Sequence, residues 1–204
     1  MGRFADLLAH DGVEEELELR STFGFMAFHG GNLEVGTDEV AALAAAASGS
    51  SLYAVRQPPS LRWHVPSREV TPDQSPALAA FLDHVEVAVA LHGYGRDGMW
   101  TSVLAGGRNR SLAAHVSAAI RDGMPGYDVI DELEDIPREL RGVHPANPVN
   151  CCRGGGVQLE LPPRCRSWTP YWDEHLEPGD PIPHLTDLAD VLAEAARRWP
   201  GVRG

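Results

Sequence analysis

Short apolar runs bounded by glycine or proline recur along this chain and predict buried β-strands. Phe23–Phe28 and Val85–Leu91 are apolar at nearly every position, which is typical of strands that are covered on both faces. Leu61–Val65 alternates between apolar and polar residues, so we expect an edge strand there. Further strands are predicted at Ser51–Arg56, Trp100–Ala105, Tyr127–Ile130 and Val157–Leu161. Phe23–Phe28 is therefore expected near the centre of a sheet.

Segments in which apolar residues recur at helical spacing alternate with these strands. The predicted helices are Glu39–Ala47, Pro76–Asp83, Ser111–Arg121 and Thr186–Trp199. This alternation predicts an α/β fold with a mixed, mostly parallel central sheet and helices on both faces. We expect residues 1–204 to form a single domain. Residues 1–19 would be an acidic lead-in with a short helix, and residues 167–204 a Pro- and Trp-rich segment followed by the C-terminal helix.

The balance of charged residues argues against several classes of function. The formal charge of -12 disfavours a nucleic-acid or anionic-membrane surface, since phosphate binding needs clustered positive charge. All 17 basic residues are arginine, so neither a lysine nucleophile nor a P-loop lysine is present. Any bound anion would therefore be held by guanidinium groups, which suit carboxylates.

The N-terminus and the cysteines bear on the cellular location. The N-terminus has no apolar segment of the signal-peptide kind, and no apolar run reaches membrane-spanning length. Cys151, Cys152 and Cys165 show no disulfide framework. We therefore expect a cytoplasmic protein.

Histidine and glutamate residues stand where predicted strands end. His29 and His92 each follow an apolar strand and precede a glycine, and Glu160 lies near the end of Val157–Leu161. Parallel strands place their carboxyl ends at one edge of a sheet, where ligands bind in such folds, so these three residues are expected to converge. Glu34 adds a carboxylate from the glycine-rich turn after His29. The group indicates a zinc site of His29, Glu34 and His92, with Glu160 as the base that takes a proton from water.

Several motifs also match, in the same order, those of a known family. They are HGGNLE at 29–34, GTDE at 36–39, LHG at 91–93, GGRN at 106–109 and GVQLEL at 156–161. Through these motifs residues 20–166 resemble the poly-gamma-glutamate hydrolase family, zinc enzymes related in fold to zinc carboxypeptidases. The resemblance implies zinc ligands at His29, Glu34 and His92 and a catalytic carboxylate at Glu160. It also implies hydrolysis of γ-glutamyl amide bonds in poly-γ-glutamate or in a related acidic peptide.

Binding of a polyanionic substrate by an acidic chain needs local positive charge or hydrogen-bond donors. Arg108 and Asn109 follow a Gly-Gly turn, and Arg153 precedes three glycines, so we expect these residues to hold a substrate carboxylate or the oxyanion. His64 is a further candidate for contact with the substrate.

Other interpretations of the same residues stay open. The fold could serve a zinc peptidase or amidase with a different acidic substrate, and Cys151 or Cys152 could act with His144 as a cysteine hydrolase. A binding module without catalysis is a third interpretation. Either histidine alone could be a packed residue, and the bulky segment after His92 could close the site.

Overall fold

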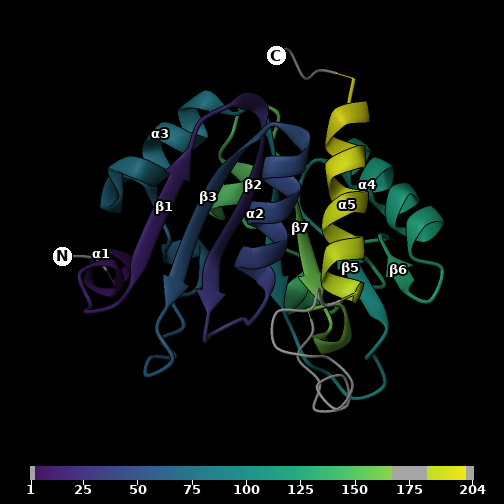
Figure 1. Ribbon diagram of the computed structural model, residues 1–204, viewed down its shortest axis with the longest axis horizontal. Helices are drawn as coiled ribbons and strands as arrows, with labels where there is room; N and C mark the ends of the chain where they lie inside the picture. Colours follow the sequence, from purple (N-terminus) through teal and green to yellow (C-terminus); the bar gives the residue numbers. More distant parts are fainter. Residues whose placement is uncertain (1–2, 167–182, 201–204) are drawn as a thin grey trace.

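The computed structural model describes residues 3–166 and 183–200 and is built around one seven-stranded sheet (Figure 1). The strands are β1 Glu14–Glu18, β2 Ser21–Gly31, β3 Ser50–Gln57, β4 Val87–Gly93, β5 Ser102–Ala105, β6 Asp128–Ile130 and β7 Gly156–Leu161. Their order across the sheet is β1-β3-β2-β4-β7-β5-β6. β3, β2, β4 and β7 run parallel, β1 is antiparallel to β3, and the parallel pair β5 and β6 runs antiparallel to β7. The sheet is thus mixed and mostly parallel, as predicted.

Helices cover both faces of the sheet, which also confirms the prediction. They are α1 Arg3–Leu8, α2 Thr37–Ser48, α3 Pro76–His84, α4 Arg110–Gly123 and α5 Pro183–Arg198. Short 3-10 helices lie at Ser67–Glu69, Pro72–Gln74, Arg138–Leu140, Pro148–Asn150 and Pro163–Arg166. α2, α4 and α5 pack on one face, and α1 and α3 on the other (Figure 1). Successive side chains of a strand point to opposite faces, so β2 places Phe25 in one core and Met26 in the other.

None of the helices in the described ranges combines the length and the apolar character that a membrane crossing requires.

Two segments differ from the expectations. Glu14–Glu18, expected in a solvated lead-in, is the edge strand β1, whose pairing with β3 leaves its side chains at least partly exposed. Leu61–Val65 is not a strand, because β1 already occupies the free edge of β3. This segment is a loop held by Gln57, whose side-chain amide donates to the Trp63 carbonyl (2.8 Å) and accepts from the Trp63 N–H (2.7 Å). The Pro- and Trp-rich segment 167–182 lies outside the described residues.

Candidate metal and catalytic site

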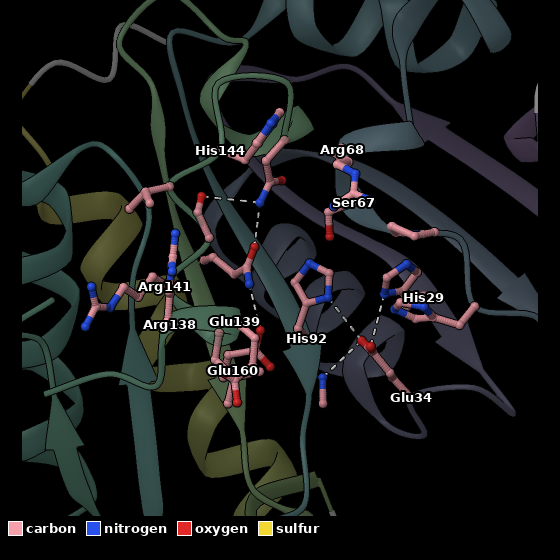
Figure 2. A pocket seen from close by; sticks show the side chains of 18 of the residues that line it. His29, Glu34, Ser67, Arg68, His92, Arg138, Glu139, Arg141, His144 and Glu160 are labelled. Atoms are coloured by element: carbon pink, nitrogen blue, oxygen red, sulfur yellow. Dashed lines mark hydrogen bonds and ion pairs between the residues drawn. The ribbon is translucent and has the colours of Figure 1, made fainter. Parts of the chain in front are cut away.

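Three neighbouring strands bring site residues to one edge of the sheet. His29 lies near the end of β2, His92 near the end of β4 and Glu160 near the end of β7. β4 pairs with both other strands, and His92 stands beside Glu160 in the register. Figure 2 shows the side chains of all three residues around one pocket. The parallel arrangement of β2, β4 and β7 is therefore what brings these side chains together.

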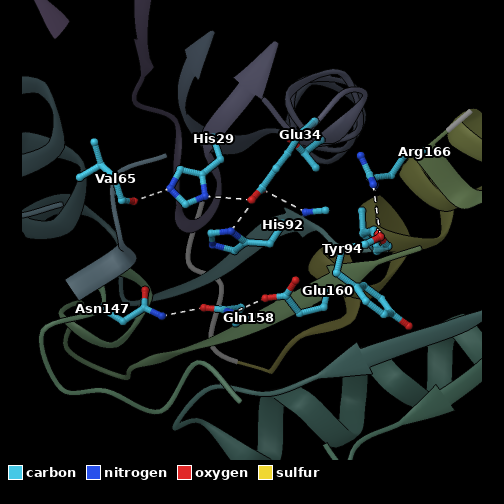
Figure 3. Close-up of polar contacts among 12 residues, drawn as sticks. His29, Glu34, Val65, His92, Tyr94, Asn147, Gln158, Glu160 and Arg166 are labelled. Atoms are coloured by element: carbon cyan, nitrogen blue, oxygen red, sulfur yellow. Dashed lines mark hydrogen bonds and ion pairs between the residues drawn. The ribbon is translucent and has the colours of Figure 1, made fainter. Parts of the chain in front are cut away.

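Glu34 joins this group from the loop between β2 and α2. The loop turns back on itself because the Glu34 N–H donates to the His29 carbonyl (3.0 Å). One carboxylate oxygen of Glu34 lies 3.0 Å from His29 Nδ1, and the other lies 3.3 Å from His92 Nδ1 (Figure 3). His29 is 1% exposed and His92 is 3% exposed. The candidate ligand atoms of the three residues all lie within 4.8 Å of one another, so two imidazoles and a carboxylate share a small buried space.

Hydrogen bonds determine which nitrogen of His29 faces this space. The Val65 carbonyl lies 2.8 Å from His29 Nε2 and can only accept, so Nε2 carries a hydrogen and donates it. Nδ1 is then the nitrogen that faces Glu34, and it offers a lone pair to an ion when the ring is neutral. Glu34 is itself held in place, because its carboxylate accepts the Gly93 N–H (3.0 Å). The backbone thus orients the side chains of both candidate ligands, His29 and Glu34.

Negative charge in this group is concentrated on Glu34. Burial alone would raise the pKa of Glu34, but the two imidazoles hold it well below its usual range. Burial lowers the pKa of His29, but the charge and hydrogen bond of Glu34 outweigh that effect and raise it overall. The ionised carboxylate and two imidazoles fit a divalent ion, and two histidines with one glutamate are a known ligand set of catalytic zinc. His92 faces Glu34 with Nδ1, while its Nε2 is buried without a hydrogen-bond partner in the described part of the chain.

Glu160 is held by a chain of two side-chain amides. Asn147 Nδ2 donates to Gln158 Oε1, and Gln158 Nε2 donates to Glu160 Oε1, each over 2.6 Å (Figure 3). All three side chains are buried. Asn147 Nδ2 also donates to the Gly142 carbonyl (3.3 Å), which fixes the orientation of both amides. One oxygen of Glu160 is thereby positioned, and no hydrogen bond within residues 3–166 and 183–200 engages the other.

Burial also changes the acidity of Glu160. Burial raises the pKa of this carboxyl to about 7. His92 partly opposes this rise, and the negative charge of Glu34 adds to it. A carboxyl group with that pKa can both accept and release a proton near neutral pH.

The pocket that contains these residues has a volume of about 760 Å³. His64 lines it, with its ring centre 4.9 Å from that of His29. The segment 138–144 forms another part of the wall, and Arg68 lines the pocket as well (Figure 2). The buried His–Glu–His group therefore faces a space large enough for a segment of substrate.

Comparison with families of known proteins gives a match over most of the chain. The family model described as poly-gamma-glutamate hydrolase matches residues 5–169. The chain belongs to the poly-gamma-glutamate hydrolase family. This confirms the resemblance carried by the motifs, and it makes the protein a hydrolase that acts on amide bonds.

Several solved structures share this fold. A bacteriophage poly-gamma-glutamate hydrolase is 25% identical, with a TM-score of 0.74 over 93% of this chain and 91% of that chain. A structure described as "YNDL-apo (Zinc-free)" is 22% identical, with a TM-score of 0.73 over 91% of this chain and 90% of that chain. A gene product of Agrobacterium tumefaciens shares the fold at 10% identity, with a TM-score of 0.55 over 91% and 92% of the two chains. The search of curated protein sequences gave no match.

The cysteines do not form a rival catalytic site in the described residues. The sulfur atoms of Cys151 and Cys152 donate to backbone carbonyls, and no hydrogen bond joins either of them to His144 in residues 3–166 and 183–200. Burial raises the pKa of both thiols, that of Cys152 to about 12. A nucleophilic cysteine needs a lowered pKa, so the geometry does not support a cysteine hydrolase.

Arg108, Asn109 and Arg153 lie away from the pocket. The Asn109 N–H donates to the carbonyl of Gly156, the first residue of β7, and Arg153 pairs with a glutamate that precedes β4 (3.0 Å). β5 runs antiparallel to β7, so the turn that follows β5 lies beside the start of β7. The start of β7 is roughly 13 Å along the strand from Glu160. The prediction that these three residues hold the substrate is therefore not supported by their position.

Other residues around the site were given no role by the sequence: Asn147, Gln158, Arg62 and Arg166. Gln158 stands two residues before Glu160 and shares its face of β7. The two-residue period of a strand could therefore have identified it as a neighbour of Glu160. Asn147 and Arg166 reach the site through the paths of loops, for which the sequence offers no comparable signal.

Proposed function

We propose that this protein is a zinc-dependent amidohydrolase that cleaves γ-glutamyl amide bonds in poly-γ-glutamate or in a related acidic peptide. The observation that carries the proposal is the buried group of His29, Glu34 and His92 beside Glu160 in one pocket. The two imidazoles and the Glu34 carboxylate would hold the ion, a set of donors that zinc favours. A zinc ion there would supply Lewis acidity toward water and toward the amide carbonyl.

Glu160 supplies the acid–base step in this proposal. The oxygen left free by Gln158 accepts a proton from the attacking water and then passes it to the leaving amine. A pKa near 7 suits both halves of this transfer.

Positive charge in the pocket offsets part of the net charge of -12, which repels a polyanion at long range. Arg138 lines the pocket and has no ion pair or hydrogen bond from its side chain within the described residues. Arg68 also lines it, and its nearest acid is its own neighbour Glu69 at 4.0 Å. Both guanidinium groups are thus available to carboxylates of the substrate.

Turnover of a defined polymer tests this function. Protein loaded with zinc is expected to shorten poly-γ-glutamate, to stop doing so after treatment with a chelator, and to recover when zinc is added back. The readouts are polymer length by size-exclusion chromatography and the release of amines. Cleavage of α-linked polyglutamate alone would show a peptidase with a different substrate. Loss of activity with a thiol alkylator but not with the chelator would contradict the role of the metal.

The substitution Gln158→Leu tests the chain of amides. Leucine keeps most of the volume but cannot donate to Glu160, so we expect kcat to fall by about 10–100-fold, with KM and zinc content unchanged. Gln158 is a positioning residue that acts on kcat through Glu160. In the Glu160→Gln background, the additional substitution Gln158→Leu should therefore have no further effect on kcat.

Asn150→Ala is the matched control for that substitution. Asn150 Nδ2 donates to the same Gly142 carbonyl (2.7 Å), but no hydrogen bond joins Asn150 to Gln158 in the described part of the chain. We expect this variant to keep its kcat within a few-fold of the wild type. An equal loss of kcat in the two variants would show that Gln158 acts only through the stability of the loop.

A further inference from the structure

A smaller pocket of about 190 Å³ adjoins the first and shares Leu33 and Gly93 with it. Two arginines line the smaller pocket, Arg62 at its exposed rim and Arg166 in its buried wall. The shared residues place it directly beside the loop that carries Glu34.

Arg166 is fixed by carbonyls that belong to the catalytic elements. Its Nη1 donates to the Val35 carbonyl (2.8 Å), its Nε to the Leu161 carbonyl (3.0 Å) and its Nη2 to the Tyr94 carbonyl (3.4 Å). These carbonyls follow Glu34, end β7 and follow β4, so the guanidinium keeps a constant position relative to the site (Figure 3). Gly93 gives it room, because a Cβ there would come within 2.5 Å of Arg166 Cζ.

Within the described part of the chain, no acid is paired with the positive charge of Arg166. The side chain is 6% exposed, and no ion pair joins it to any carboxylate in residues 3–166 and 183–200. Acids are abundant, with 29 of them against 17 arginines, and other arginines such as Arg56 and Arg121 do pair with one. Glu34 and Glu160 interact with Arg166 electrostatically, but the first is engaged by two imidazoles and the second by Gln158.

A buried cation without a counter-ion is costly, and a ligand that carries negative charge removes that cost. A guanidinium has five N–H donors, of which Arg166 uses three, so one remains on each Nη. Arg62 brings a second guanidinium to the same pocket and has no ion pair or hydrogen bond from its side chain among the described residues. Planar guanidinium groups match carboxylates in shape as well as in charge.

We propose that Arg62 and Arg166 form a carboxylate-binding subsite, which holds the free α-carboxylate of the glutamyl residue on one side of the bond that is cleaved. The inference rests on the proposed function, because it assigns the orientation of the substrate at the same site. The subsite would select substrates that carry a free carboxylate next to the reacting amide.

Peptides that differ by one charge test the subsite. The substrates are γ-linked tetraglutamate and two analogues in which the α-carboxylate on one or the other side of the central bond is amidated. The wild type is expected to cleave the free acid with a kcat/KM at least ~10-fold above that of one analogue, the one that lacks the carboxylate held by the subsite. Arg62→Ala and Arg166→Lys should reduce this ratio by about 10-fold, through a higher KM for the free acid and little change for that analogue.

Arg153→Ala is the matched control, because Arg153 is an exposed arginine paired with Glu86 away from both pockets. It is expected to keep the wild-type ratio. Arg62 is exposed, so Arg62→Ala is not expected to disturb folding. This variant therefore tests the subsite even if the change at Arg166 does disturb folding. An unchanged ratio in Arg62→Ala, with hydrolysis intact, would overturn the subsite and leave the proposed function standing. No cleavage of the peptides or of poly-γ-glutamate by the zinc-loaded wild type would overturn both.

Discussion

The substitution Glu160→Gln is expected to lower kcat by at least ~10²-fold while zinc content stays unchanged. Glutamine keeps the shape of the side chain and can still accept the hydrogen bond from Gln158, but it cannot take a proton from water. Glu160 is not among the proposed ligands, so the ion should remain bound. Steady-state hydrolysis of poly-γ-glutamate and elemental analysis of the same sample measure the two quantities. Unchanged turnover would refute the role of Glu160.

The stability of the metal-free protein provides a control for this variant. Between the ordinary pKa of 4.5 and the raised value of about 7, the folded protein keeps a proton on Glu160 that the unfolded chain has released. The free energy of unfolding therefore falls as the pH rises through that window. Glu160→Gln removes this pH-dependent loss of stability and should raise the free energy of unfolding by about 3 kcal/mol at pH 8, and by less at pH 5. Denaturant unfolding in the presence of a chelator measures both values, and a less stable variant at pH 8 would show that its inactivity reflects damage to the fold.

The second large effect is expected from His29→Ala, which should lower zinc affinity by more than ~100-fold and abolish hydrolysis with it. The substitution removes a nitrogen donor and also leaves the buried Glu34 carboxylate with one imidazole instead of two. Zinc titration against a competing chelator measures the affinity directly, without reference to activity. The metal-free variant should also be less stable, because a buried charge loses a partner.

His64→Ala is the matched control for metal binding. His64 lines the same pocket, and its ring lies beside that of His29, but it is outside the His–Glu–His group. We expect this variant to bind zinc with nearly the wild-type affinity, whatever its effect on substrate. Equal loss of zinc from both variants would contradict the ligand assignment.

The central part of the fold could be predicted because burial leaves a clear pattern in the sequence. Phe23–Phe28 and Val85–Leu91 are apolar on both faces, and both lie mainly in central parallel strands. Glu14–Glu18 was not predicted as a strand, since an edge strand needs only backbone pairing on one side and tolerates charged side chains. Leu61–Val65 has the alternation of a strand, but β1 takes the edge that it would have needed.

The candidate site likewise contains residues that the sequence could place and residues that it could not. His29, His92 and Glu160 were placed together because the ends of parallel strands meet, and the structure does bring them together. Arg108 and Arg153 were expected at the site because each stands beside a glycine-rich turn, but the antiparallel direction of β5 and the amino-terminal position of Arg153 relative to β7 place them away from it. Contacts between segments far apart in the sequence, such as those of Arg166 with Val35 and Tyr94, depend on the path of the chain in space, which a local sequence pattern does not record.

The bond between His29 and the Val65 carbonyl has a consequence for mutational scanning. Its acceptor is a main-chain atom, so exchanging Val65 for another amino acid changes the packing but leaves the oxygen in the chain. A survey of single substitutions would therefore assign residue 65 a role in stability and would not register its role in the proposed metal site. Shortening or rerouting the loop between Gln57 and Ser67 would expose that role, because it moves the oxygen itself.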